Sequence, residues 1–209
     1  MTQSAAAECD LFDGAPSSPG GFSYWPDVIS RDEETVWVQQ LESLPFKPFE
    51  FHGYLGKRKT VSFGWRYDYA GRALRVSEPI PDFLEPLRLR AAAVAGLGVQ
   101  HLQQALVTEY DTGVTIGWHR DKPMFEDVVA LSFLSTCRLR LRRKHGARWE
   151  RRSTEIAPRS IYRLSGPARH EWEHSIPPVE GLRYSVTFRS FVAGFGALTT
   201  DANSIQTGA

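Results

Sequence analysis

Apolar residues recur every three to four positions in two stretches of the N-terminal half. The first begins after Ser30, which forms a capping-box pattern with Glu33, and stops before Pro45. The second runs over residues 82–94 and stops at Gly96. This spacing, bounded by helix start and stop signals, predicts two helices. The mostly apolar stripe of the first helix is Val36, Trp37, Gln40, Leu41 and Leu44.

From residue 104 onward the apolar spacing changes to alternation or to short unbroken runs. Residues 104–110 alternate, 128–135 form an apolar run, and 137–142 alternate leucine with arginine. Alternation sends neighbouring side chains to opposite faces of a strand. Short strands that follow helices predict an α+β, mainly β fold, an antiparallel double sheet or jelly roll. Further strands are predicted at 22–25, around Ile156, at 161–164 and at 183–191.

The two ends of the chain lack these periodicities. Residues 1–21 are rich in Ala, Ser, Pro and Gly, and residues 194–209 are small and polar, so we expect both to be disordered tails. The chain has 209 residues, of which 42% are apolar. That content is enough for one sizeable core, and we expect a single domain over residues 22–193.

Charge and cysteine content exclude several classes of protein. The net charge is +1, so contact with a nucleic acid would require a local basic patch. Cys9 and Cys137 cannot form a disulfide framework and have no metal-type spacing. The sequence contains neither a long apolar run nor a secretory signal. We expect a cytoplasmic, monomeric protein that does not enter the membrane.

Three residues form a candidate metal site. His119 and Asp121 are two positions apart, a spacing that puts both side chains on one face of a strand, and His174 follows 53 residues later. Two imidazoles and one carboxylate leave open coordination positions and suit Fe(II) oxygenases, whereas zinc more often takes more nitrogen or sulfur ligands. A His-X-Asp pair on its own also occurs as a hydrogen-bonded surface pair.

Two arginines of the last predicted strand suggest a carboxylate ligand. Arg183 and Arg189 are six positions apart and therefore share a face. Arginines inside a barrel are costly unless they meet carboxylates, and a dicarboxylate cosubstrate would supply them. The alternative is an exposed face with two solvated arginines, while Val186 and Phe188 point into the core.

Two basic segments could contact a nucleic acid. In residues 54–69, cations and aromatic rings suit a lid over a nucleotide, although an aromatic hairpin has the same composition. In residues 138–152, arginines could contact phosphates or could line a solvated sheet face. The candidate substrate-binding residues are Arg58, Lys59, Trp65, Tyr67, Tyr69, Arg142 and Arg143.

The combination of these motifs resembles the AlkB family of Fe(II)- and 2-oxoglutarate-dependent dioxygenases. The resemblance covers residues 54–191 and is carried by His119-Arg120-Asp121, by His174, and by the motif from Arg183 to Arg189 that ends Thr-Phe-Arg. It implies a double-stranded β-helix flanked by the two helices, with a nucleotide-recognition lid at about 54–76. It also implies Fe(II) held by the two histidines and the aspartate.

The same resemblance implies roles for other residues. Arg183, helped by Tyr110, would pair with the distal carboxylate of 2-oxoglutarate, and Arg189 would lie near the keto-acid end. Thr108 and Ser185 stand where family members often carry asparagine. The rings that would stack on a damaged base opposite His119 are those of Trp65, Tyr67 and Tyr69.

The implied activity is oxidative dealkylation of N-alkylated bases in single-stranded or duplex DNA, or in RNA. It would couple O2 and 2-oxoglutarate to the release of succinate, CO2 and an aldehyde. Alternatives are modification of a tRNA base rather than repair, a 2-oxoglutarate-dependent hydroxylase of a protein or small molecule, and a non-catalytic nucleic-acid binder. Pro123 stands where many family members carry an acidic residue near the base, so the base contact must differ, with Glu126 and Asp127 as candidates.

Overall fold

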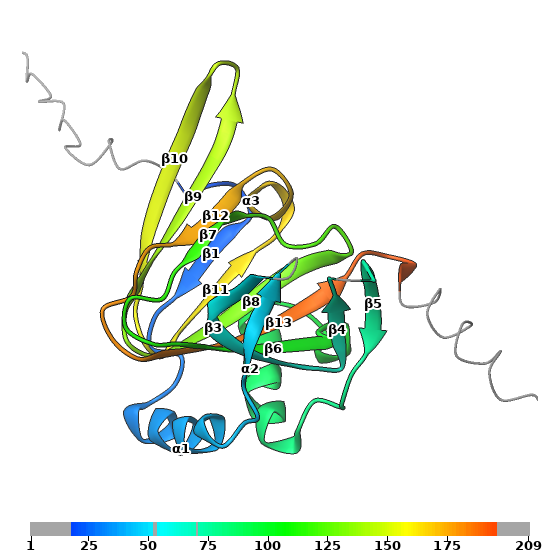
Figure 1. Cartoon of the computed structure of the whole chain (residues 1–209), viewed down its shortest axis with the longest axis vertical. Coiled ribbons are helices and arrows are strands. Elements are labelled where there is room, and N and C mark those ends of the chain that lie inside the picture. Colours follow the sequence, from blue (N-terminus) through cyan, green and yellow to red (C-terminus); the bar gives the residue numbers. More distant parts are fainter. Residues whose placement is uncertain (1–17, 52–53, 70, 196–209) are drawn as a thin grey trace, which may run out of the picture.

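Two antiparallel sheets form the body of the protein. The computed structural model describes residues 18–51, 54–69 and 71–195 (Figure 1). The larger sheet contains, in order of pairing, β1 (Phe22–Trp25), β11 (Ser160–Leu164), β8 (Phe125–Leu134), β13 (Arg183–Phe191), β6 (Gln104–Tyr110), β3 (Tyr54–Phe63) and β2 (Lys47–Phe51). The smaller sheet contains β10 (Arg148–Ile156), β9 (Cys137–His145), β12 (Glu173–Ile176) and β7 (Ile116–His119).

The space between the sheets holds one of two apolar cores. Alternating residues of β9 and β8 supply Leu139, Leu141 and Ala130, all fully buried. The alternation in β9 is the one that the sequence pattern predicts, and it places one face of that strand inward, whereas the predicted apolar run of β8 is buried on both faces. The arrangement is the predicted jelly roll. Polar residues line the open end of the space between the two sheets.

The second core lies between the larger sheet and the helices. The helix predicted after Ser30 is α1 (Arg31–Glu42), and the second is α2 (Glu85–Ala95), preceded by a short 3-10 turn (Asp82–Leu84). Both helices pack against β8 on the outer face of the sheet (Figure 1). Gly96 ends α2 in the left-handed region, with φ 66°, as the stop signal requires. Two shorter helical segments are Val99–His101 and α3 (Gly166–His170).

The first turn of α1 is stabilised by side-chain capping. Ser30 Oγ accepts a hydrogen bond from Glu33 N at 3.1 Å, and Glu33 Oε2 accepts one from Ser30 N at 2.7 Å. This is the predicted capping box. The buried face differs from the predicted stripe, because Val36 is 55% exposed whereas Glu34 is 8% exposed. Glu34 tolerates burial because it accepts a hydrogen bond from Leu134 N and pairs with Arg159.

The predicted lid is not one structural unit. β3 is paired with β6 inside the larger sheet, and only β4 (Trp65–Asp68) and β5 (Ala73–Val76) form a separate hairpin. Most of the two predicted tails lies outside the described residues, although Gly20 and Gly21 accept hydrogen bonds from Ala168 and Ser165. In the described part of the chain, no helix has the length and apolar character needed to cross a membrane.

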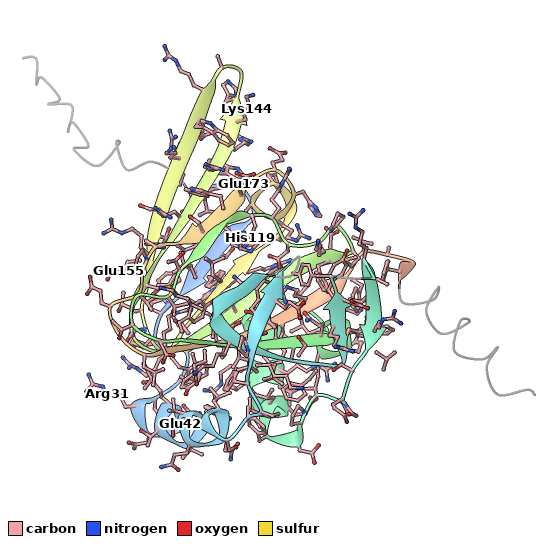
Figure 2. The ribbon with its side chains drawn as sticks, in the orientation of Figure 1. Arg31, Glu42, His119, Lys144, Glu155 and Glu173 are labelled. Carbon is pink, nitrogen blue, oxygen red and sulfur yellow. The ribbon has the colours of Figure 1, made fainter. Side chains whose placement is uncertain are left out.

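A long hairpin of β9 and β10 extends beyond the body of the smaller sheet. β12 pairs with β9 only from Arg140 to Arg142, so the segment around Lys144 has no third strand beside it. Figure 2 places Lys144 near the tip of this hairpin and Glu155 nearer its base. Some basic side chains of this hairpin form ion pairs. Arg142 pairs with Glu173 at 2.6 Å, and Arg143 pairs with Glu150 at 2.9 Å.

Candidate active site

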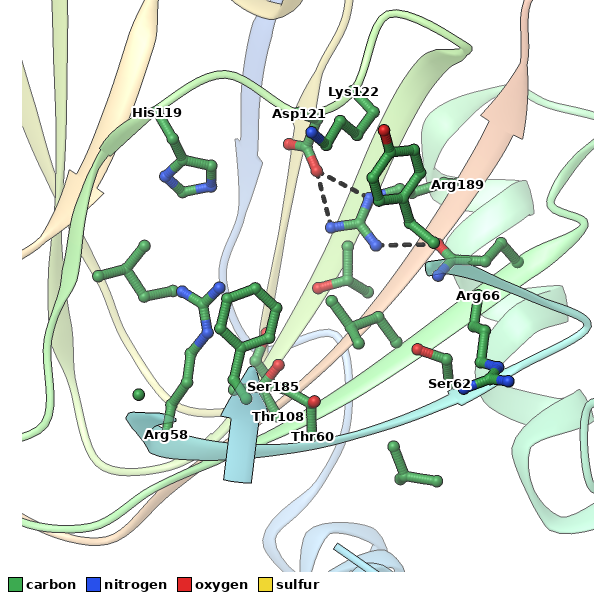
Figure 3. Close-up of a pocket in the computed structure, with 18 of the residues that line it drawn as sticks. Arg58, Thr60, Ser62, Arg66, Thr108, His119, Asp121, Lys122, Ser185 and Arg189 are labelled. Carbon is green, nitrogen blue, oxygen red and sulfur yellow. Dashed lines mark hydrogen bonds and ion pairs between the residues drawn. The ribbon is translucent and has the colours of Figure 1, made fainter. Parts of the chain in front are cut away.

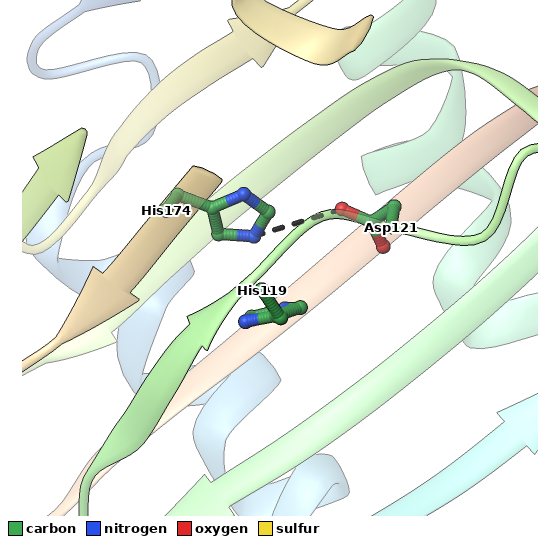
Figure 4. A group of neighbouring side chains, drawn as sticks. All are labelled: His119, Asp121 and His174. Atoms are coloured by element: carbon green, nitrogen blue, oxygen red, sulfur yellow. Dashed lines mark ion pairs between the residues drawn. The ribbon is translucent and has the colours of Figure 1, made fainter. Parts of the chain in front are cut away.

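Strand pairing brings the three predicted metal ligands together. His119 ends β7 and lies directly opposite His174 of β12, with ring centroids 4.3 Å apart. Asp121 follows two residues later, just past the end of β7 rather than on the strand itself. One ligand atom from each of these residues lies within 4.8 Å of the others (Figure 4). This cluster could hold one metal ion on its two imidazoles and one carboxylate.

Neighbouring groups orient each ligand of this cluster. Gly117 O lies 2.9 Å from His119 Nδ1, a contact that favours a proton on Nδ1 and leaves Nε2 free for a metal. Asp121 Oδ1 accepts a hydrogen bond from Arg189 Nε at 2.9 Å. Its second oxygen, Oδ2, lies 3.6 Å from His174 Nε2. Each residue therefore presents one atom to the shared space, as ligation requires.

The electrostatics of the cluster favour the protonation states that bind a metal. Burial, reinforced by the neighbouring His119, lowers the pKa of His174 to about 3, and burial also lowers the pKa of His119. Burial by itself would raise the pKa of Asp121, but the Arg189 guanidinium holds that pKa well below its ordinary value. At neutral pH the two imidazoles are therefore neutral and the carboxylate is ionised.

Arg183 offers a buried binding site for a carboxylate. Its side chain is fully buried, and its Nε donates to Ser132 Oγ at 3.0 Å. The guanidinium carbon lies 4.9 Å from the centre of the Tyr110 ring. Neither terminal nitrogen has a hydrogen-bond partner among the described residues. A buried cation with two unused donors is costly unless a ligand completes it, and a carboxylate matches both donors.

The other predicted cosubstrate residues lie on β6 and β13. Thr108 and Ser185 are cross-strand partners, are 4% and 3% exposed, and, like Tyr110, line the pocket that contains the metal cluster. Arg189 is 9% exposed and bonds both Asp121 and Gln104, so it holds the metal ligand in place. The face shared by Arg183 and Arg189 therefore points inward, and the alternative of an exposed strand face is wrong.

A pocket of about 1300 Å³ opens above the metal cluster (Figure 3). Tyr67 and Tyr69 line it with their rings 4.9 Å apart, in an edge-on arrangement. Lys122 Nζ lies 4.4 Å from the centre of the Tyr67 ring. Arg58 reaches into the pocket from β3 (Figure 3). Aromatic rings and cations thus share one wall beside His119, Asp121 and His174.

Four of the predicted substrate residues do not line this pocket. Trp65 packs edge-on against Phe191 instead, with centroids 5.8 Å apart. Lys59 follows Arg58 on β3 and points to the opposite face, where it pairs with Glu109 at 2.6 Å. The other two, Arg142 and Arg143, lie on β9. Alternation along β3 explains the difference between the two neighbouring cations.

The acidic residues considered as replacements at Pro123 also lie outside the pocket lining. Asp127 is buried, pairs with Arg163 at 2.8 Å and accepts a hydrogen bond from Ser190. Glu126 is paired with His170 at 3.2 Å. Both carboxylates are therefore engaged by other partners, and a contact of either with the base stays a prediction. Lys122, which directly follows the metal ligand Asp121 in the chain, does line the pocket.

The sequence reasoning missed several pocket residues. Phe49 of β2 lies 3.8 Å under the Arg58 guanidinium and meets Tyr69 at 5.4 Å. Gln104 orients Arg189, and Arg66 lines the pocket from β4. No local motif marks these residues, because they come from separate strands that only tertiary pairing brings together.

Comparison with known proteins agrees with this geometry. Residues 21–189 match the 2OG-Fe(II) oxygenase superfamily. The chain belongs to this superfamily. The match covers most of the domain predicted from the sequence and includes the metal cluster, Arg183 and Arg189. Members of the 2OG-Fe(II) oxygenase superfamily use Fe(II) and 2-oxoglutarate, for which the cluster and the Arg183 site have suitable ligand atoms.

Two sequence relatives refine the assignment within the superfamily. The chain is 30% identical over 192 residues to an "Alkylated DNA repair protein ALKBH8 homolog" of Arabidopsis thaliana, covering 80% of this chain and 53% of that protein. It therefore spans about half the length of that relative. It is also 27% identical over 193 residues to an uncharacterized protein, L905, of Acanthamoeba polyphaga mimivirus, covering 82% of this chain and 85% of that protein. The first match supports the AlkB-like resemblance.

Solved structures share the fold. The structure of OsALKBH1 has a TM-score of 0.59 at 15% identity and covers 81% of this chain and 96% of that one. A prolyl-4-hydroxylase of Pseudomonas putida has a TM-score of 0.55 at 14% identity, covering 83% and 94% of the two chains. At these identities the matches show the fold of 2OG-Fe(II) oxygenases and do not distinguish their substrates.

Proposed function

We propose that this dioxygenase removes alkyl groups from the ring nitrogens of bases in DNA or RNA. The observation that carries the proposal is the wall of Tyr67, Tyr69 and Lys122 beside the metal cluster. Unpaired bases stack on aromatic side chains, and cations contact the phosphates that flank them. The match to an ALKBH8 homologue named as an alkylated DNA repair protein supports the same reading.

The reaction exchanges an N-alkyl bond for an N–H bond. For a methyl group, one O2 and one 2-oxoglutarate convert N–CH3 into N–H and formaldehyde, with release of succinate and CO2. Bound Fe(II) and 2-oxoglutarate supply the oxidising chemistry, and the protein supplies binding and orientation. An alkylated base must leave its stack to reach a buried site of this kind.

The residues of this chain then have distinct tasks. His119, Asp121 and His174 hold the metal, with Arg189 fixing one oxygen of the aspartate. Arg183 receives the distal carboxylate of the cosubstrate in a dry environment, where charge-assisted pairing is strong. Tyr67 and Tyr69 hold the flipped base so that its alkyl group faces the cluster.

The direct test is an assay of protein loaded anaerobically with Fe(II) and 2-oxoglutarate. On addition of O2, methylated single-stranded DNA, duplex DNA and tRNA are compared, and succinate, formaldehyde and base composition are followed. We expect at least one of these substrates to stimulate turnover and to lose its methyl groups. The Asp121→Ala variant is the matched control and should be inactive.

Two outcomes would redirect the assignment. Turnover stimulated by a peptide or small molecule, with none by any nucleic acid, would favour a hydroxylase of such substrates. Oxidation of a tRNA base without release of formaldehyde would favour tRNA-base modification over repair. If no methylated nucleic acid is demethylated, the proposal is wrong.

A further inference from the structure

Two cations that lie over aromatic rings of the pocket have no carboxylate partner among the described residues. Arg58 lies 3.8 Å over the Phe49 ring, and no described residue forms an ion pair or hydrogen bond with its guanidinium. Lys122 lies over the rings of Tyr67 and Tyr69, at 4.4 and 5.0 Å, and likewise has no acidic partner among the described residues. Arginines elsewhere in the fold, such as Arg142 and Arg143, do have one.

These cations flank one continuous aromatic wall. Phe49 meets Tyr69 edge-on at 5.4 Å, and Tyr69 meets Tyr67 at 4.9 Å, with Arg58 and Lys122 at the two ends. Figure 3 shows Arg58 pointing from β3 into the pocket toward His119. Arg58 is half-buried, and burial lowers its pKa, yet a guanidinium stays charged at neutral pH. It therefore presents desolvated donors close to the metal cluster.

The pocket offers little negative charge to offset them. Among the described residues, the carboxylates that line it are Asp121, Glu50 and Glu78. Asp121 is engaged by Arg189 and belongs to the metal cluster, while the other two are on exposed residues. A substrate base beside Arg58 and Lys122 therefore meets an excess of positive charge and hydrogen-bond donors.

Alkylated bases fall into two chemical classes that this environment distinguishes. Adenine alkylated at N1 and cytosine alkylated at N3 are cations at neutral pH, and an amino group flanks the alkylated nitrogen. Uracil alkylated at N3 and hypoxanthine alkylated at N1 are neutral, and a carbonyl oxygen flanks it. A guanidinium donates hydrogen bonds and accepts none, so it matches the second class and repels the first.

We propose that the pocket selects neutral, carbonyl-bearing alkylated bases over cationic ones, with Arg58 as the main specificity-determining side chain and Lys122 as a second. The proposal rests on the proposed function. Arg58 would donate to the carbonyl oxygen next to the alkylated nitrogen, and Lys122 would add to the rejection of a cationic base.

The test uses pairs of oligonucleotides that differ only in this feature. In single strands of one sequence, 3-methyluridine is compared with 3-methylcytidine, and 1-methylinosine with 1-methyladenosine. We expect kcat/KM to favour the carbonyl member of each pair by about tenfold or more, the discrimination of a good polar contact to a base edge. Anaerobic binding with Fe(II) and 2-oxoglutarate should show the same order without turnover.

Variants of Arg58 test whether this side chain causes the preference for carbonyl-bearing bases. Arg58→Met should lower kcat/KM for 3-methyluridine about tenfold or more while leaving that for 3-methylcytidine unchanged or higher. Arg58→Lys should keep the rejection of 3-methylcytidine, because the charge remains. The matched control is Lys59→Met, the neighbouring cation on the opposite face of β3, which should leave the ratio unchanged.

The two failures can be told apart. Demethylation that favours 3-methylcytidine, or that does not distinguish the pair, overturns the inference and leaves the proposed function intact. An absence of demethylation of all four oligonucleotides overturns the inference, and it overturns the proposed function as well if the DNA and tRNA substrates of the direct assay also keep their methyl groups. Because the wild-type comparison needs no variant, the inference can be overturned even if Arg58→Met does not fold.

Discussion

His119 and His174 are directly opposite each other in the pairing of β7 with β12, although 53 positions separate them in the chain. Their ring centroids are 4.3 Å apart, and both face Asp121. Backbone hydrogen bonding between the strands therefore fixes the relative position of two of the three ligands. A preformed cluster of this kind reduces the ordering that metal binding must impose.

Loss of one imidazole should weaken metal binding. We expect His174→Ala to weaken Fe(II) affinity and to lower turnover by more than about 100-fold, since even residues behind the ligands contribute 10- to 100-fold. Anaerobic calorimetry with Fe(II) measures the first quantity, and succinate release measures the second. The control is His170→Ala, which removes an exposed histidine paired with Glu126 and should change neither. Full Fe(II) affinity in His174→Ala would exclude His174 as a ligand.

Removal of the Arg183 guanidinium should weaken the binding of 2-oxoglutarate without lowering the thermal stability of the protein. Its two terminal nitrogens have no partner in the described structure, so Arg183→Met removes an uncompensated buried charge and should not lower the thermal midpoint of the ligand-free protein. Affinity for 2-oxoglutarate should fall about 10- to 100-fold, because a charge-assisted pair is lost.

The readout for Arg183 is ligand-induced stabilisation. At 100 times its dissociation constant, 2-oxoglutarate should stabilise the wild-type protein by about 2.7 kcal/mol, and after a 10- to 100-fold loss of affinity Arg183→Met should keep only about 1.4 to 0.4 kcal/mol of this at the same concentration. Equal stabilisation of the two proteins would place the distal carboxylate elsewhere.

The two tyrosines of the β4–β5 region should affect substrate use and not the metal centre. Tyr67→Ala or Tyr69→Ala should reduce nucleic-acid turnover by about 10- to 100-fold, the value of one to three kcal/mol for a stacked base. Uncoupled decay of 2-oxoglutarate should persist. Trp65→Phe is the control, because Trp65 packs on Phe191 and does not line the pocket. An equal loss in the control would point to general damage to the hairpin.

The contribution of the capping box to the free energy of unfolding should depend on pH. The hydrogen bond from Arg90 and the one from Ser30 lower the pKa of Glu33 from 4.5 to about 2. A depressed pKa means that the stabilisation is complete above about pH 4.5 and is lost as the pH falls toward 2. Glu33→Gln should therefore lower the free energy of unfolding by up to about 1 kcal/mol at pH 7.

Denaturant titrations of both proteins at several pH values test this expectation. The difference between wild type and Glu33→Gln should narrow as the pH falls below about 4.5. A difference that stays constant down to pH 2 would show that the charge of Glu33 contributes nothing to the free energy of unfolding.

The salt dependence of binding should reveal whether the β9–β10 hairpin contacts phosphates. Lys144, Arg148 and Arg151 are exposed, so the triple alanine variant removes charge without disturbing the core. If they contact a single strand, the slope of log K against log salt should fall by about 2, because each phosphate contact contributes about 0.7. Arg31→Ala on α1 is the control. An unchanged slope would mean that these cations form a solvated face.

Much of the fold could be predicted from local sequence. Ser30 with Glu33 marks the start of α1, Gly96 ends α2, and the alternation of leucine and arginine in β9 marks its buried and outer faces. Such features depend on neighbours a few positions away, so the pattern alone contains the information. The burial of Glu34 in place of Val36 was not predictable, because its partners Leu134 and Arg159 are more than 90 positions away.

The chemistry of the metal centre was also within reach of the sequence, because the identity and spacing of His119, Asp121, His174, Arg183 and Arg189 restrict it to one cofactor class. The arrangement of the aromatic rings and cations that line the pocket depends on the tertiary structure. Arg58 and Lys59 are equivalent in the sequence, and only the pairing of β3 with β6 sends one into the pocket and the other to Glu109. Side chains from separate strands meet only when the sheets close, and that closure determines which charges a base encounters.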